Sequence, residues 1–213
     1  MLSENQLKSN KEEFKRLVNS ITREGAKDLL DWLETTDFYT APASVRYHSC
    51  YKGGLCQHSI NVYRNMEKLR NEFCPEVSED TCKIVALFHD ISKVGFYEET
   101  VQNKKVYSKN GTKSDELGNF DWVSVKGYKV KSDTDKSFVC HTHGVNSYLL
   151  IHRFIKLTQS ETAAIMNHHS GMDDNMAVKD ISEVLNRYPA ATLLHMADYL
   201  STFITENPYM VNE

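Results

Sequence analysis

The chain has 213 residues, with 25 Lys and Arg against 29 Asp and Glu and a formal net charge of −4. At this length roughly 70% of the surface of the unfolded chain can be buried, so a core forms without disulfide bonds or structural zinc. The acidic balance disfavours a dedicated binder of duplex DNA, and the 40% of hydrophobic residues is typical of a globular protein of one domain.

The cysteines and the apolar runs indicate the compartment. The five cysteines are odd in number, and none belongs to a C-x-x-C pair. This usage favours a reducing, intracellular environment. Residues 1–16 are polar, and no apolar run approaches the roughly 18 residues that a membrane span requires. We therefore expect a cytoplasmic protein without a membrane partner.

Helical periodicity governs the first part of the chain. Residues 14–21 place Phe, Leu, Val and Ile at the i, i+3, i+4, i+7 spacing of an amphipathic helix. Further helices are predicted over about residues 26–33 and after Gly53-Gly54. Ser78, followed by two acidic residues, is typical of the N-cap of a helix that runs to about Lys93.

Residues 96–137 have a different texture and predict an inserted β-ribbon. From residue 103 to residue 136 there are eight Lys against five acidic residues. Alternating stretches at 120–125 and 128–130 predict a hairpin that turns at Lys126-Gly127, with a second ribbon near residues 101–107.

Helical periodicity returns after the insert. One helix is predicted from His143 and another over residues 160–169. After a loop, a short helix is expected at about residues 181–188. Pro189 then begins a last helix that runs to about Ile204, because the missing N–H of proline is harmless at the first helical position.

Five polar residues occupy helix positions where apolar side chains would be expected. A single inward-facing His is ordinarily a core residue. Several imidazoles and two carboxylates in one core are costly unless a cation compensates for them, and this nitrogen and oxygen set suits Mn, Fe, Co, Ni or Zn. The five residues are His58, His89, Asp90, His168 and Asp198.

Motifs around these residues resemble those of the HD superfamily of metal-dependent phosphohydrolases. The segment H-x-x-Y-x-G-G-L-x-x-H ending at His58 is similar to that carrying the first ligand in bacterial HD-domain 3′-to-5′ exoribonucleases. Residues 89–93 resemble the H-D-x-x-K motif, and residues 194–198 the closing L-H-x-A-D motif. His143-Gly144 and His168-His169 stand where the two-metal members, including HD-GYP phosphodiesterases, have extra histidines. The chain lacks a G-Y-P signature, so cyclic dinucleotide specificity is not implied.

The resemblance implies an all-α HD-domain helical bundle with a small β-ribbon insertion. Residues 1–213 would form a single domain, interrupted by the polar insert at about residues 96–137. It further implies one or two divalent transition-metal ions. The first ion would be held by His58, His89, Asp90 and Asp198, and the second by Asp90, His143 and His168, with His169 as an additional candidate.

The roles of the remaining polar residues allow alternatives. Asp90 and Lys93 are the predicted catalytic residues. Lys93 lies one helical turn after Asp90, where it would meet a substrate phosphate, or it is simply a cation at a helix C-terminus. Arg46 and His48 are predicted to bind substrate as an anion-binding rim, although loop residues of this kind are usually solvated.

Two further histidines and the insert receive simpler interpretations. His152 shares a helical face with apolar residues and is predicted to be a core or boundary residue. His195 lies one turn before Asp198 and is expected to orient it. The insert should emerge beside the metal site, where it is either solvated surface or a cover for a phosphorylated substrate.

The resulting prediction is a phosphohydrolase that cleaves a phosphomonoester or phosphodiester bond. Its expected partner is a phosphorylated small molecule such as a nucleotide, or a short RNA. Two alternatives remain open at this point. One is a di-iron oxygenase, which uses a similar His and Asp set, and the other is a non-catalytic nucleotide-binding module.

Overall fold

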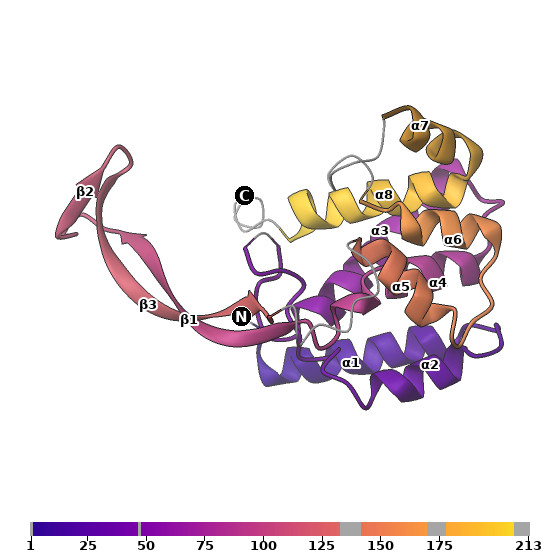
Figure 1. Ribbon diagram of the computed structural model, residues 1–213, viewed down its shortest axis with the longest axis horizontal. Helices are drawn as coiled ribbons and strands as arrows, with labels where there is room; N and C mark the ends of the chain where they lie inside the picture. Colours follow the sequence, from indigo (N-terminus) through magenta and orange to yellow (C-terminus); the bar gives the residue numbers. More distant parts are fainter. Residues whose placement is uncertain (1, 47, 133–141, 170–177, 207–213) are drawn as a thin grey trace.

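The computed structural model describes residues 2–46, 48–132, 142–169 and 178–206. Over these residues the chain is mostly helical, with eight α-helices and one three-stranded sheet (Figure 1). The α-helices are α1 (Glu4–Asn19), α2 (Ala26–Leu33), α3 (Gly54–Phe73), α4 (Glu79–Phe88), α5 (His143–Ile151), α6 (Gln159–Met166), α7 (Val178–Arg187) and α8 (Pro189–Leu200).

Local capping explains where several helices begin. Ser3 and Gln6 form a reciprocal capping box at the start of α1, and Thr158 and Glu161 form another at α6. The predicted N-cap Ser78 accepts a hydrogen bond from a backbone N–H in the first turn of α4. Pro189 is the first residue of α8, as predicted.

The core lies where α1, α3, α4 and α8 pack together. Helix α4 is the central element, because every residue from Cys82 to Phe88 is buried. The rings of Phe14 and Phe38 lie 4.7 Å apart, and Phe88 completes this group at 6.0 Å from Phe14. The central position of α4 places the residues that follow it inside the helical body. None of the described helices combines the length and apolar character needed to cross a bilayer.

Two helices end earlier than predicted. Helix α4 stops at Phe88, and a short 3-10 turn, η1 (Ile91–Lys93), follows it. Helix α6 stops at Met166, so His168 and His169 lie beyond its end rather than within it. At the other end of the chain, α8 continues into a π-helical turn, η3 (Ser201–Thr205).

The insert forms an antiparallel ribbon that projects away from the helices (Figure 1). Strand β1 (Tyr97–Tyr107) pairs along its whole length with β3 (Gly118–Val130), and β2 (Lys113–Asp115) pairs with the far end of β3. The β character of the insert was predicted, but the hairpin turn at Lys126-Gly127 was wrong. Gly127 lies within β3 opposite Thr100, and a Cβ there would come 2.8 Å from the side chain of Gln102. This glycine therefore provides space for a neighbouring side chain, which a sequence pattern cannot distinguish from a turn.

Candidate metal centre

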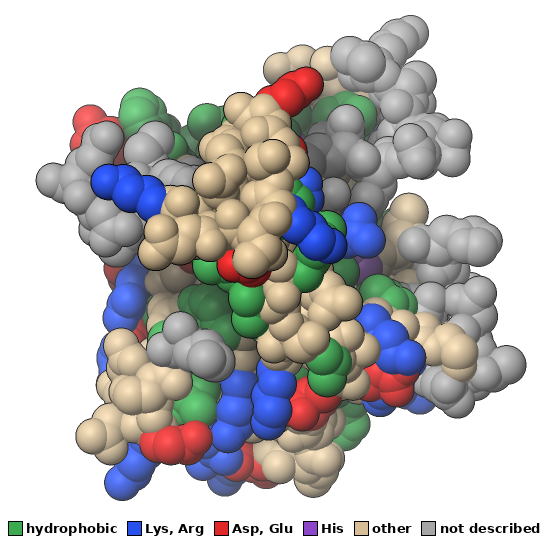
Figure 2. Space-filling view, turned by 90° about the vertical axis from the view of Figure 1, so that its left-hand side faces the viewer, with side chains coloured by type: hydrophobic (Ala, Val, Ile, Leu, Met, Phe, Trp, Pro, Cys, Tyr) green, Lys and Arg blue, Asp and Glu red, His purple; other side chains and the backbone are tan. Residues whose placement is uncertain are grey.

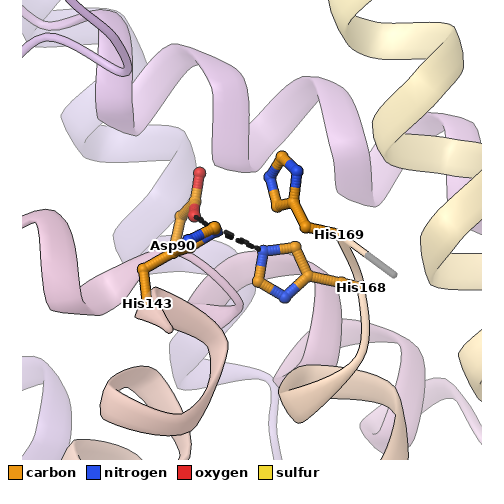
Figure 3. Close-up of side chains that lie close together, drawn as sticks. All are labelled: Asp90, His143, His168 and His169. Atoms are coloured by element: carbon orange, nitrogen blue, oxygen red, sulfur yellow. Dashed lines mark hydrogen bonds and ion pairs between the residues drawn. The ribbon is translucent and has the colours of Figure 1, made fainter. Parts of the chain in front are cut away.

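Asp90 lies at the centre of a cluster of buried histidines. It follows the end of α4, and its two carboxylate oxygens face different groups of rings. Oδ1 is 3.4 Å from Nε2 of His143 and 3.6 Å from Nε2 of His168. Figure 3 shows these side chains facing one another. Oδ2 is 3.4 Å from Nε2 of His89 and 3.7 Å from Nε2 of His58. The carboxylate thus has the placement of a bridge between two groups of ligands.

The first group comes from α3, α4 and α8. Nε2 of His58 lies 3.1 Å from Oδ1 of Asp198 and 3.3 Å from Nε2 of His89. All three side chains are buried. The sequence-predicted ligands of the first ion are therefore brought together within the helical body.

The second group comes from the start of α5 and the segment after α6 (Figure 3). Nε2 of His143 lies 3.1 Å from Nε2 of His168. His169 faces the same region, with its Nε2 3.6 Å from Oδ2 of Asp198. The four predicted residues Asp90, His143, His168 and His169 can each direct one ligand atom into a common space.

Hydrogen bonds define which ring nitrogen is free to bind a metal. Nδ1 of His89 lies 2.9 Å from the carbonyl oxygen of Ala86, and Nδ1 of His168 lies 2.6 Å from that of Ile165. A carbonyl oxygen can only accept, so each Nδ1 carries the proton and each Nε2 presents a lone pair.

The convergence of these lone pairs tests whether a metal ion fits. Asp90 Oδ1 is buried and has no hydrogen-bond donor among the described residues. Nε2 of His143 and Nε2 of His168 both converge on this oxygen, and acceptor atoms that converge in this way repel one another unless a cation lies among them. The donor set is the one that suits divalent transition metals. The residues present therefore fit one or two such ions.

Burial and the carboxylates act in opposite directions on the histidines. Burial alone would lower the pKa of His58, but Glu206 and Asp198 raise it to about 10. Burial and the neighbouring His168 hold the pKa of His143 well below its usual range. Burial would raise the pKa of Asp90, but Lys93 and His89 keep it well below the usual range, so this carboxylate is ionised.

Lys93 is buried and pairs with the central carboxylate. Its ammonium nitrogen lies 2.6 Å from Oδ2 of Asp90. Burial would lower the pKa of this lysine, but Asp90 raises it. In the structure Lys93 therefore forms an ion pair with Asp90. Its contact with a substrate phosphate stays a prediction.

The predicted substrate rim is divided between the surface and the interior. Arg46 is exposed. The ring of His48 lies 4.5 Å from that of His58, and both of its nitrogens are buried without a hydrogen-bond partner in the described part of the chain. Burial lowers the pKa of His48 to about 4, so the ring is neutral. Of Arg46 and His48, only His48 lies against the cluster of buried histidines.

The other histidines separate into one that supports the cluster and one that does not. Nδ1 of His195 donates to the carbonyl oxygen of His168 at 2.8 Å, so it holds the segment after α6 rather than Asp198. The prediction of His152 as a core or boundary residue was wrong. It is exposed at the end of α5, where its ring stacks on Tyr148. Helix α5 buries the face of Gly144, Ser147 and Ile151, so the face that His152 shares with Leu149 points outward.

Glu206 is a member of the site that the sequence analysis missed. Its Oε1 lies 3.0 Å from Nδ1 of His58. Glu206 follows Asp198 by eight residues, about two helical turns, so it shares the face of Asp198. This periodicity could have identified it, but the predicted helix ended at Ile204.

Fold and site together define a mostly helical protein with a buried His and Asp centre suited to metal ions. The sequence profile of the HD domain matches residues 55–202, more than half of the chain, and the chain belongs to the HD domain family. This confirms the predicted superfamily. The matched range includes His58 and Asp198 but ends before Glu206. Comparisons with curated proteins and with solved structures gave no match.

Proposed function

We propose that the protein is a metal-dependent phosphohydrolase that cleaves a phosphomonoester or phosphodiester bond of a nucleotide or short oligonucleotide. The observation that carries this proposal is the position of Asp90, with one carboxylate oxygen toward each of two groups of histidines. Family membership supports it, because HD domains include metal-dependent phosphohydrolases.

The ligand sets follow from the two groups. His58, His89 and Asp198 would hold one ion together with Asp90. His143 and His168, with His169 as a further candidate, would hold the other, again together with Asp90. Two ions held there would lower the pKa of bound water and would stabilise the charge on the attacking and leaving oxygens of a phosphoryl group.

The burial of the site's side chains indicates the side from which a substrate enters and what holds Asp90 in position. His58, His89 and His168 are almost completely buried, whereas the side chains of His143 and His169 are 20% and 25% exposed. Substrate would therefore enter from the side of His143 and His169. Lys93 keeps Asp90 ionised and fixed in the middle of the site, which preserves its two-sided geometry.

In this proposal the ribbon would cover the substrate. Strand β1 begins four residues after Lys93, and the hydroxyl of Tyr97 at its base is close enough to influence the pKa of that lysine. Figure 2 shows the face from which the ribbon projects: basic and acidic side chains are interspersed on it, and a small patch of histidine reaches the surface. This mixture favours a small phosphorylated substrate over a long nucleic acid, which would select a uniformly basic surface.

The test combines metal titration with phosphate release. Purified protein is stripped with a chelator, titrated with Mn²⁺, and assayed on nucleotides, cyclic dinucleotides and short RNA. We expect two ions per chain and hydrolysis that the chelator abolishes. His143→Ala or His168→Ala should lose one ion and reduce turnover by about 10²–10³-fold, because the leaving oxygen loses its counter-charge. His152→Ala, which alters an exposed histidine, is the matched control.

Three outcomes would contradict the proposal in different ways. One ion with full hydrolysis would eliminate the two-ion arrangement and leave His143 and His168 as phosphate-binding groups. Oxygen consumption by an iron-loaded protein without phosphate release would indicate the di-iron oxygenase. Nucleotide binding without turnover under any metal would indicate a binding module.

A further inference from the structure

The segment that follows α8 meets the loop before α3 beside the metal centre. Glu206, at the end of η3, has a side chain that is only 3% exposed. Its Oε1 accepts hydrogen bonds from Nδ1 of His58 and from the amide of Asn61, both at 3.0 Å. Its Oε2 accepts from the hydroxyl of Ser49 at 2.6 Å. Both oxygens of the carboxylate thus accept hydrogen bonds, and one of the donors, His58, is a predicted metal ligand.

We propose that Glu206 is a positioning residue that fixes His58 as an Nε2 ligand, and that Ser49 and Asn61 hold Glu206 in place. This inference rests on the metal centre of the proposed function but not on the reaction that occurs there. It extends the functional unit beyond residue 202, where the match to the HD domain ends.

The three core histidines explain why His58 needs such a partner. His89 and His168 lie just after helices, where the last carbonyl groups have no partner within the helix. Each donates from Nδ1 to one of these carbonyls, Ala86 and Ile165 respectively. His58 lies inside α3, where the surrounding carbonyls are used by the helix itself. An acceptor must therefore come from elsewhere in the fold, and Glu206 supplies it.

The backbone is irregular both in the turn before Glu206 and at its hydrogen-bond partner Ser49. The π-helical turn η3 precedes Glu206, and the amide of Asn65 on α3 donates to Ser201 at 2.9 Å and to Thr205 at 3.2 Å. Ser49 has a φ of +46°, a left-handed conformation that a serine rarely adopts. Irregular turns and left-handed residues persist where surrounding contacts impose them. Here both converge on one carboxylate.

A carboxylate has a stronger effect on the metal ligand than a carbonyl oxygen. It fixes the tautomer and orientation of the ring, and it makes the metal-binding nitrogen more basic. Loss of such a partner typically weakens metal binding by about 10–100-fold.

The experiment measures metal affinity directly, without relying on activity. Wild type, Glu206→Ala and Glu206→Gln are stripped, and the dissociation constant for Zn²⁺ is measured by competition with a chromophoric chelator. We expect Glu206→Ala to bind the tighter ion about 10–100-fold more weakly. Glu206→Gln should recover part of this loss, because its amide oxygen still accepts from Nδ1 of His58. Ser49→Ala should have an intermediate effect.

A matched control separates positioning from general stability. Glu161 is another fully buried carboxylate, paired with Arg23 at 2.8 Å and outside the metal cluster. Glu161→Gln should lower the urea midpoint of the metal-free protein and leave Zn²⁺ affinity unchanged. If Glu206→Ala misfolds, Glu206→Gln and Ser49→Ala still carry the test.

The outcomes are distinguishable from failure of the proposed function. Wild-type Zn²⁺ affinity in folded Glu206→Ala would overturn the positioning role, whatever the protein hydrolyses. Reduced affinity in this variant would support the role even if no phosphate is released from any substrate. A wild-type protein that binds no metal would overturn both.

Discussion

The helical body and the ribbon differ in which side chains they bury and which they expose. In the body, His58, His89 and Asp90 are almost completely buried. In the ribbon, Val101 is 70% exposed and Trp122 is 50% exposed. The body therefore buries polar side chains, and the ribbon exposes apolar ones.

The difference follows from how each region is held together. Helices packed on several sides of α4 supply enough apolar burial to offset the cost of a polar cluster. The ribbon consists mainly of β1 paired with β3, and Phe120 is its one buried hydrophobic residue within the described strands. An isolated two-stranded ribbon is marginally stable in water. The residues that fit metal ions thus lie in the body, whereas the ribbon leaves apolar side chains exposed.

The strongest expected effect comes from Asp90→Ala. Removal of this carboxylate takes a ligand from both groups of histidines and leaves the charge of Lys93 buried and unpaired. We expect loss of metal retention, loss of hydrolysis, and a decrease of about 3–5 kcal/mol in the free energy of unfolding. Metal analysis, phosphate release and urea denaturation check these three effects.

The double variant Asp90→Ala/Lys93→Met separates the two causes. It should recover much of the lost stability, since no unpaired charge remains, but neither metal nor activity. Retention of metal by either variant would show that Asp90 is not the bridge.

A pair of truncations compares the two regions directly. Leu29 on α2 is fully buried, and Val101 on β1 is largely exposed. Leu29→Ala should lower the free energy of unfolding by about 2–5 kcal/mol through lost burial and a cavity. Val101→Ala should change it by no more than about 0.5 kcal/mol. Both are measured by urea denaturation in chelator, and similar losses would mean that the ribbon packs against something in solution.

Excision of the ribbon tests its independence from the metal centre. Residues 101–126 are replaced by Asn-Gly, which forms a tight turn between the facing residues Thr100 and Gly127. We expect unchanged metal affinity and unchanged hydrolysis of a minimal aryl phosphate, with a lower kcat/KM for nucleotides. Loss of metal binding would show that the ribbon helps to build the site.

A pH-dependent effect concerns a buried thiol of the body. Burial raises the pKa of Cys82 to about 12. Above its unfolded pKa of about 8.5 the thiol ionises only in the unfolded chain, so stability decreases as pH rises. At pH 9.5 this contributes a loss of about 1.4 kcal/mol relative to pH 7. The pH dependence of unfolding in Cys82→Ala should be flatter by this amount, and identical profiles would contradict the prediction.

Local patterns predicted much of the body and many of the residues that gather in the site. The spacing of Phe14, Leu17 and Val18 identified a buried face of α1. The motifs around His58, His89 and Asp198 identified residues that the fold does bring together. Such features depend on helical periodicity and on residue types with narrow chemical uses, and both are present in the linear sequence.

Other features depended on where each helix ends. The location of His168 beyond α6 follows from early helix termination, whereas the outward position of His152 follows from which face of α5 is buried. The role of Gly127 depends on the side chain of Gln102 across the ribbon. Helix ends and strand register result from competition between local preference and packing, which a single sequence does not display.

Residue types and their spacing were enough to identify a helical framework that carries histidines and carboxylates suited to metal ions. Folding alone brings Glu206 to His58, because these two residues are 148 positions apart and meet where the end of α8 packs beside α3. The pairing of Lys93 with Asp90 is a local i, i+3 contact, although the sequence left open whether this lysine meets a phosphate. Ligand identity is a property of single residues, but the direction of each nitrogen and oxygen is set by packing among distant segments.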